Sequence, residues 1–256
     1  MEPTTIVLIL AAIVAISLVI IVFSQMREKA RIERVRKTTA QQDSYNRASR
    51  LLTEIPGQYL NTDLKLILLK QMEDACNALL ALKSDKPVDK WLESVKQIQQ
   101  QVISKTDRYP PVKIDSPEKA SYVKELLHSL FKLIESMHKS GRVDSATAKQ
   151  NLKYVLFLIH KTHADLHVFQ ARDYIRHNET RKAIHAYHLA STEMGKSKDN
   201  ALALKAVKSF RIRIKELEAS LLDGNSDVRN TSKLDQEWDN FLQDDDSWKK
   251  RADYDS

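Results

Sequence analysis

The chain has 256 residues, with 41 lysine and arginine residues against 34 aspartate and glutamate residues, and it holds only four glycines, six prolines and one cysteine. Glycine and proline together make up about 12% of an average protein, so their scarcity disfavours a turn-rich β-sandwich or barrel and leaves little for glycine-rich nucleotide loops. The single thiol, Cys76, excludes an internal disulfide framework.

The first predicted element is an uncharged, apolar run at residues 6–23, which follows a short tail at residues 1–5. A helix of this length spans roughly 27 Å, close to the roughly 30 Å of a bilayer's hydrocarbon core. The run lacks the basic start and the small-residue cleavage site of a signal peptide. It therefore predicts a single transmembrane helix.

Residues 24–53 are predicted to continue as a basic helical stalk, because residues 24–50 hold eight basic and three acidic side chains and no helix breaker. Basic flanks stay on the cytoplasmic side. The sequence thus predicts a single-pass protein of the bacterial inner membrane, with its N-terminus outside and its body in the cytoplasm. Contact with the lipid bilayer accounts for the basic cluster without nucleic acid. The residues expected at the membrane surface are Arg27, Lys29, Arg31, Arg34, Arg36 and Lys37.

Helical periodicity continues through the rest of the chain. Residues 54–105 are predicted to form a helical hairpin, and three of the six prolines place a linker at residues 106–117. A helical domain follows at residues 118–222, where Ser116 before Pro117 and Asp144 are typical helix starts. No stretch alternates as a strand does, so the predicted fold class is all-α: a transmembrane helix and a bundle of helical hairpins.

Within this domain, residues 164–194 carry small and aromatic residues at the spacing of two antiparallel helices. These are Ala171, Tyr174, Asn178, Ala183, Tyr187 and Ala190. The pattern resembles one tetratricopeptide repeat over about an eighth of the chain. It departs from the repeat at His167, Gln170 and Gly195. The resemblance implies a helical hairpin that contacts a protein partner through Tyr174, Asn178 and Tyr187.

The layout of the whole chain also resembles a group of bacterial single-span inner-membrane proteins. The features in common are the apolar N-terminal span, the basic stalk, the helical body and the acidic tail. This resemblance implies placement in the inner membrane and no particular activity.

Six of the eight histidines fall between residues 160 and 188. His160, His163 and His167 lie three and four residues apart, a spacing that places their nitrogens on one helix face, where they could bind zinc or copper. A catalytic zinc motif would add an intervening glutamate and a third ligand at a fixed distance, and neither is present. The three histidines are therefore weak metal candidates, and the sequence predicts no cofactor.

No constellation of catalytic residues stands out. The four glycines are too scattered for a phosphate-binding loop. Cys76 has acidic and apolar neighbours, which do not lower the pKa of a thiol. The sequence therefore predicts a protein that is not an enzyme.

The last segment, residues 223–256, holds five basic and ten acidic residues. In a helix Trp238, Phe241 and Leu242 would share one face, and Trp248 follows. Apolar anchors in an acidic segment are typical of docking into a groove. Three outcomes are open: the segment docks onto the protein's own basic body, it docks onto a partner, or it does not dock.

Together these observations predict a membrane-anchored cytosolic helical adaptor or scaffold with an unknown protein partner and an undefined oligomeric state. A metal-responsive membrane protein and a nucleic-acid-associated membrane protein are the alternatives.

Overall fold

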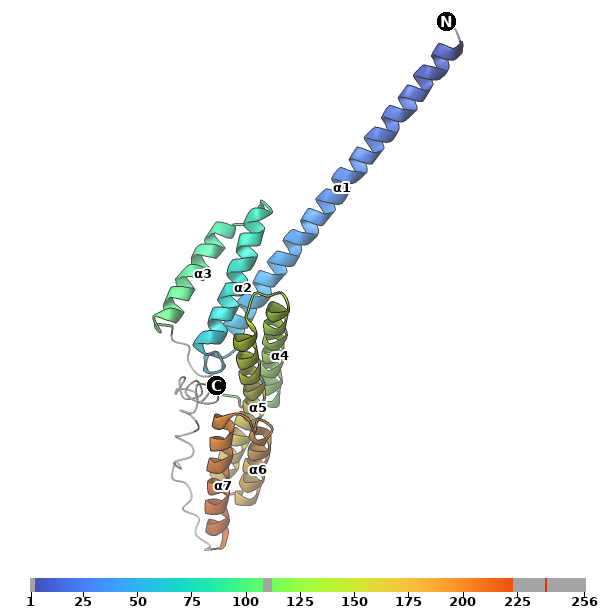
Figure 1. Cartoon of the computed structure of the whole chain (residues 1–256). Coiled ribbons are helices and arrows are strands. Elements are labelled where there is room, and N and C mark those ends of the chain that lie inside the picture. Colours follow the sequence, from blue (N-terminus) through green and yellow to red (C-terminus); the bar gives the residue numbers. More distant parts are fainter. Residues whose placement is uncertain (1–2, 108–111, 223–237, 239–256) are drawn as a thin grey trace. The chain divides into compact units, whose positions relative to one another are not determined.

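The computed structural model describes residues 3–107, 112–222 and 238, with side chains described from residue 21 onward. Within these ranges every regular element is a helix (Figure 1), which confirms the all-α fold class. The elements are α1 (Pro3–Glu54), the short 3-10 helix η1 (Gly57–Tyr59), α2 (Thr62–Ala81), α3 (Val88–Ile103), α4 (Pro117–Lys139), α5 (Ser145–Arg176), α6 (Thr180–Gly195) and α7 (Ala201–Leu222).

The predicted membrane placement needs correction. Among the helices of the described part of the chain, none is both long enough and apolar enough to cross a membrane. This finding contradicts the prediction of a single-pass inner-membrane protein with a cytoplasmic body. The described side chains of α1 begin at residue 21, and most of those at residues 27–37 are charged. Residues 6–20 of the predicted span have a helical backbone, and their side chains lie outside the described part.

The chain divides into two compact units. The first comprises residues 1–49 and 69–98, and the second comprises residues 50–68 and 99–256. The first unit contains most of α1, the larger part of α2 and most of α3. The second contains η1 and helices α4 to α7.

In the first unit, side chains from α1 contact both α2 and α3. Gln71 donates a hydrogen bond to the Ser44 hydroxyl at 2.5 Å. The rings of Tyr45 and Trp91 stack with their centroids 4.8 Å apart. Beneath this stack lies a small core that links α2 to the start of α3. Its buried members are Cys76, Leu79 and Val88.

The C-terminal end of α2 is held by an arginine from α1. The Arg34 guanidinium donates to the carbonyl oxygen of Leu82 at 2.6 and 3.0 Å and to that of Lys83 at 3.2 Å. The last carbonyls of a helix lack intrahelical partners and carry the negative end of the helix dipole. A cation from a neighbouring helix therefore satisfies both their hydrogen-bonding capacity and their charge.

Sharp helix ends are built here largely without glycine. The residue just past the end of α2, α3, α4 and α5 adopts a positive φ, and these residues are Lys83, Lys105, Gly141 and Asn178. At the end of α5, the Glu179 N–H donates to the Tyr174 carbonyl and the Asn178 N–H to the Ile175 carbonyl. The other three ends repeat this pair of bonds, which defines the Schellman motif. Three of these four left-handed positions carry a side chain.

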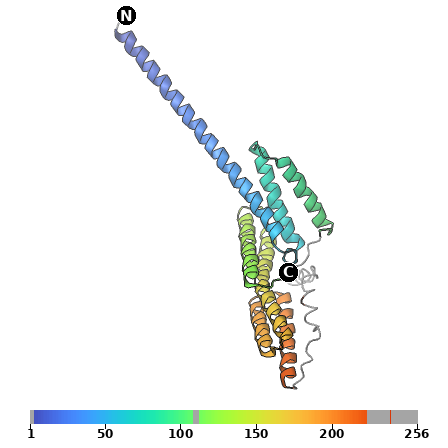
Figure 2. The same ribbon diagram turned by 180° about the vertical axis from the view of Figure 1, so that it is seen from behind.

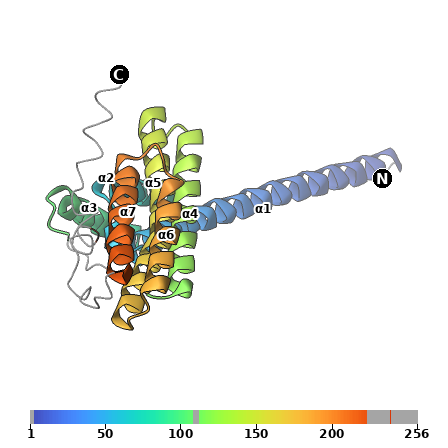
Figure 3. The same ribbon diagram turned by 90° about the horizontal axis from the view of Figure 1, so that it is seen from below.

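In the second unit, α5 packs against α4 and α6, and α6 packs against α7. The four helices keep this arrangement when viewed from behind (Figure 2) and from below (Figure 3). Ala171, Ala183 and Ala190 are fully buried. Because alanine has only a methyl side chain, α5 and α6 approach each other closely.

The predicted helix starts are confirmed by their capping bonds. The Ser116 hydroxyl accepts from the Lys119 N–H at 3.2 Å, and Pro117 occupies the first turn of α4. The Asp144 carboxylate accepts from the Thr147 N–H at 3.0 Å at the start of α5. Each cap satisfies an N–H that the first turn of a helix leaves without a partner.

Candidate functional site

A buried ion pair on α5 forms the centre of the candidate site. Lys161 and Asp165 are one turn apart and therefore share a helix face. The Lys161 ammonium lies 2.7 Å from Oδ1 and 3.0 Å from Oδ2 of Asp165. Their side chains are only 5% and 13% exposed. Removing two charges from water is costly unless further hydrogen bonds satisfy them, so the neighbours of this pair decide whether it is stable.

Tyr59 of η1 supplies one of these hydrogen bonds. Its hydroxyl donates to Oδ2 of Asp165 at 2.5 Å, and the residue is fully buried. Burial raises the pKa of Tyr59 well above its ordinary value, and the negative charge of Asp165 and the hydrogen bond to it raise it further. The phenol therefore stays protonated at physiological pH and remains a donor.

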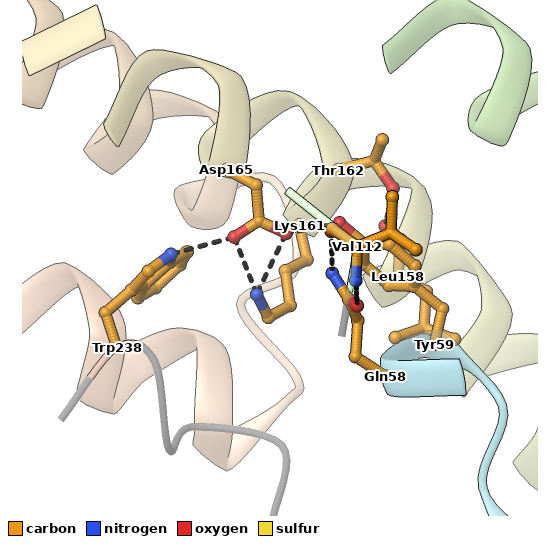
Figure 4. A network of polar contacts seen from close by, with 8 residues as sticks. All are labelled: Gln58, Tyr59, Val112, Leu158, Lys161, Thr162, Asp165 and Trp238. Atoms are coloured by element: carbon orange, nitrogen blue, oxygen red, sulfur yellow. Dashed lines mark hydrogen bonds and ion pairs between the residues drawn. The ribbon is translucent and has the colours of Figure 1, made fainter. Parts of the chain in front are cut away.

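Two contacts with the predicted linker position η1. The Gln58 side chain donates to the Val112 carbonyl at 2.7 Å and accepts from the Val112 N–H at 2.6 Å (Figure 4). Five residues earlier in the linker, Asp107 forms an ion pair with Lys65 of α2 at 2.6 Å, and both side chains are about nine-tenths buried. The described parts of residues 106–117 are thus attached to the unit that contains the site.

Trp238 completes the site from the tail. Its indole Nε1–H donates to Oδ1 of Asp165 at 2.8 Å, and the Lys161 ammonium lies 4.4 Å from the centroid of its ring (Figure 4). The Phe210 ring of α7 lies 4.8 Å away, tilted by 48°. The residue is 6% exposed. Lys161, Asp165 and Phe210 contact the indole, and Tyr59 holds Asp165 through its hydroxyl. We call these four residues the tryptophan pocket.

The pocket offers one contact for each property of an indole. The Asp165 carboxylate accepts a hydrogen bond from the N–H, the Lys161 ammonium lies over the electron-rich face, and the Phe210 ring packs against the ring system. Behind the pocket, Phe210 packs against Tyr187 of α6 with their centroids 6.1 Å apart. The wall of the pocket is therefore continuous with the core of α5, α6 and α7.

The predicted contact residues have different positions. Tyr187 is fully buried and belongs to the core, and Tyr174 is half-buried with the Lys182 ammonium 5.6 Å from its ring centroid. Asn178 is exposed at the turn between α5 and α6. Trp238 lies on the protein's own body, which was one of the three open outcomes. The remaining predicted contacts, Phe241, Leu242 and Trp248, lie outside the described residues.

The histidines do not form a metal site in the described part of the chain, where no three His, Cys, Asp or Glu side chains gather around a possible ion. His160 instead lies 3.7 Å from Glu193 of α6, and His167 lies 3.2 Å from the side-chain oxygen of Gln170. Burial lowers the pKa of His160 and His163. The nearby ammonium groups of Lys124 and Lys196 lower it further, whereas Glu193 opposes them.

The basic residues of the predicted stalk are exposed. Lys37 forms an ion pair with Glu33 at 2.8 Å, and Arg34 makes the bonds to the end of α2 described above. The other members of this group are Arg27, Lys29, Arg31 and Arg36.

Four of the five site residues were missed by sequence reasoning, which identified Trp238 and not its pocket. One signal was available: Lys161 and Asp165 are oppositely charged, four residues apart, and follow the apolar run at residues 155–159. Such a pair on a face that is otherwise buried indicates a polar contact with another segment. Tyr59 and Phe210 gave no comparable signal, because aromatic residues are common in cores.

Comparison of the chain with known protein families, with curated proteins and with solved structures found no match.

Proposed function

We propose that this chain is a helical adaptor or scaffold, without catalytic activity, that binds a linear protein segment by taking one tryptophan into the tryptophan pocket. The observation that carries the proposal is the burial of Trp238 against residues remote in sequence: Asp165 lies 73 positions away. Side chains of α5 and α7 supply a hydrogen bond, a cation–π contact and an aromatic contact to the indole.

Physical reasons support a binding role for such a pocket. Tryptophan is one of the three residues enriched at the energetic centres of protein interfaces, which lie in well-packed, dry pockets. A cation over its ring contributes about 0.5–2 kcal/mol, and an aromatic neighbour about 0.5–1.5 kcal/mol beyond the buried area. These terms are large enough for a single side chain to anchor a short segment.

The helical hairpin of α5 and α6 is in line with this role. Helical repeat proteins, to which residues 164–194 bear a resemblance, present extended surfaces to their partners. That α5 and α6 form such a repeat remains a prediction.

The proposal can be tested with the full-length chain carrying Trp238→Ala, which empties the pocket. A fluorescein-labelled peptide that copies residues 231–246 should bind this variant saturably, and fluorescence anisotropy measures the affinity. The same peptide with its tryptophan replaced by alanine should not bind. If neither peptide binds, or both bind alike, the proposed function is wrong.

A second substitution tests whether the pocket itself is the binding site. Adding Phe210→Leu should weaken peptide binding by about 2- to 12-fold, because it removes the aromatic pair and keeps an apolar side chain. The matched control is Phe131→Leu, the same change at a half-buried position of α4 that makes no contact with Trp238 among those described. Equal weakening by both changes would indicate a general loss of stability instead of a local contact.

A further inference from the structure

We infer that the pocket is shared: its external partner is an acidic segment with a tryptophan, and the chain's own Trp238 competes with that partner. This inference rests on the proposed function. It adds the chemistry of the partner and a means of regulation.

The first step is that the pocket selects tryptophan over phenylalanine and tyrosine. Oδ1 of Asp165 accepts a hydrogen bond from a ring N–H whose ring also faces the Lys161 ammonium and the Phe210 ring. Phenylalanine has no donor, and the donor of tyrosine lies beyond the ring and not within it. Of tryptophan, tyrosine and phenylalanine, only tryptophan contacts the carboxylate, the ammonium and the aromatic ring at once.

The second step is that the indole can leave the pocket while every buried charge keeps a partner of opposite charge. Without Trp238, Oδ1 of Asp165 keeps its contact with Lys161 at 2.7 Å, and Oδ2 keeps Tyr59 at 2.5 Å and Lys161 at 3.0 Å. The ammonium likewise keeps its carboxylate. An unpaired buried charge would cost several kcal/mol, and this cost does not arise. The pocket is therefore complete as a receptor when it is empty, and its tryptophan is exchangeable.

The third step concerns charge. The sequence from residue 117 to residue 222, which contains α4 to α7, holds nineteen lysine and arginine residues and eleven aspartate and glutamate residues. Around Trp238, residues 235–246 hold six acidic residues and no basic residue. Opposite charges attract over about 8–10 Å at physiological salt. A segment that replaces the tail at this body is favoured when it is acidic as well.

The fourth step is the advantage of a tethered competitor. Fifteen residues separate Leu222, the last residue of α7, from Trp238. A short tether gives an effective concentration on the order of 1 mM. For a free peptide with a Kd on the order of 10–100 μM, competition by such a tethered ligand weakens the apparent affinity by about 10- to 100-fold.

The experiment compares the labelled peptide of residues 231–246 on the wild-type chain and on Trp238→Ala. We expect binding to the wild-type chain to be about 10- to 100-fold weaker. Equal affinities for the two chains would overturn the competition and leave the proposed function intact, since the peptide would still bind. Loss of binding to both chains would instead contradict the proposed function.

A second variant keeps the pocket and Trp238 unchanged, in case Trp238→Ala alters folding. Residues 226–232 are replaced by a protease recognition sequence of the same length. After cleavage and removal of the freed tail, peptide affinity should rise to that of Trp238→Ala, and circular dichroism should show that the helices persist. An affinity that does not change on cleavage would overturn the competition.

The acidic nature of the partner has its own test. A peptide with Asp244, Asp245 and Asp246 replaced by asparagine should bind Trp238→Ala several-fold more weakly at 50 mM salt, and the difference should shrink at 500 mM salt. Equal affinity of the two peptides at low salt would show that charge does not select the partner.

Discussion

Lys161 contacts a carboxylate and an aromatic ring at the same time, and both contacts depend on the same buried ammonium group. Asp165 is the reason that this charge is tolerated. Its two oxygens accept from Lys161, Tyr59 and Trp238. The chemistry of the pocket therefore depends on one carboxylate.

Substituting Asp165 should reveal this dependence. Asp165→Ala leaves the Lys161 ammonium buried without its carboxylate, and breaking a buried pair in this way costs about 3–5 kcal/mol. Asp165→Leu combined with Lys161→Met should lower the free energy of unfolding much less, because replacing a buried ion pair by apolar residues of similar volume often leaves stability unchanged. Urea unfolding measures the stability of the single variant and of the double variant. If the single variant is as stable as the double variant, the pair is not buried as described.

The histidines between α5 and α6 should make stability depend on pH. The pKa of both His160 and His163 is lower in the folded protein than the ordinary value near 6.5. As pH falls below 6.5 the unfolded chain takes up these protons first, so the free energy of unfolding decreases until the folded-state pKa is reached. Each histidine contributes at most about 1.4 kcal/mol per pH unit.

The measurement is urea unfolding between pH 7 and pH 5. His163→Gln should reduce the slope of stability against pH, because it removes one of the two groups. His128→Gln is the matched control, since His128 is exposed on α4. Glu193 affects stability in a lower pH range. Burial raises the pKa of its carboxyl group, but the hydrogen bond from Lys196 and the charge of Lys196 lower it, and the net effect is a pKa below the ordinary 4.5. Unchanged slopes in both variants would contradict the pH prediction.

At the scale of elements, the left-handed residues at the helix ends leave room for stabilisation. Lys105 has a φ of 54° at the end of α3, where a side chain costs about 1–2 kcal/mol relative to glycine. Lys105→Gly should therefore raise the free energy of unfolding by about 1 kcal/mol, even though glycine lowers stability elsewhere. Lys105→Ala keeps the Cβ atom and should give no gain. A loss of stability with glycine would contradict the Schellman geometry.

The contact between Arg34 and the end of α2 can be tested separately. Arg34→Gln should cost about 0.5–1.5 kcal/mol, because it removes charged hydrogen bonds to carbonyls at an exposed site. Hydrogen exchange should also become faster at the last turn of α2. The matched control is Arg36→Gln, which changes an exposed basic residue of the same helix. Equal effects of the two changes would mean that the contact with α2 contributes nothing.

The elements could be predicted because their signals are local. The start of α4 at Pro117 and that of α5 after Asp144 match the expected positions, since caps and prolines act on neighbouring residues. The helix ends were harder to place, because Lys83 and Lys105 occupy positions where glycine is usual. The pocket could not be predicted, because its members come from η1, α5, α7 and the tail. Only packing brings Tyr59 within 2.5 Å of Asp165, 106 positions away in the sequence.

At the scale of the whole molecule, the tail contributes to stability through one described side chain. Deleting residues 223–256 should lower the free energy of unfolding by about 1.5–3 kcal/mol, the gain from burying a large apolar side chain. Deleting residues 247–256 alone should have little effect, because Trp238 and its neighbours remain. Thermal unfolding distinguishes the two truncations. Equal losses would show that Trp238 is not the stabilising residue.

The two described tryptophans lie in different units: Trp91 stacks on Tyr45 in the first, and Trp238 fills the pocket in the second. Because indole emission shifts to longer wavelength in water, each unit carries its own optical reporter. With Trp91 and Trp248 replaced by phenylalanine, Trp238 becomes the single emitter. The wavelength of its emission maximum then shows whether Trp238 occupies the pocket in solution, without an attached dye.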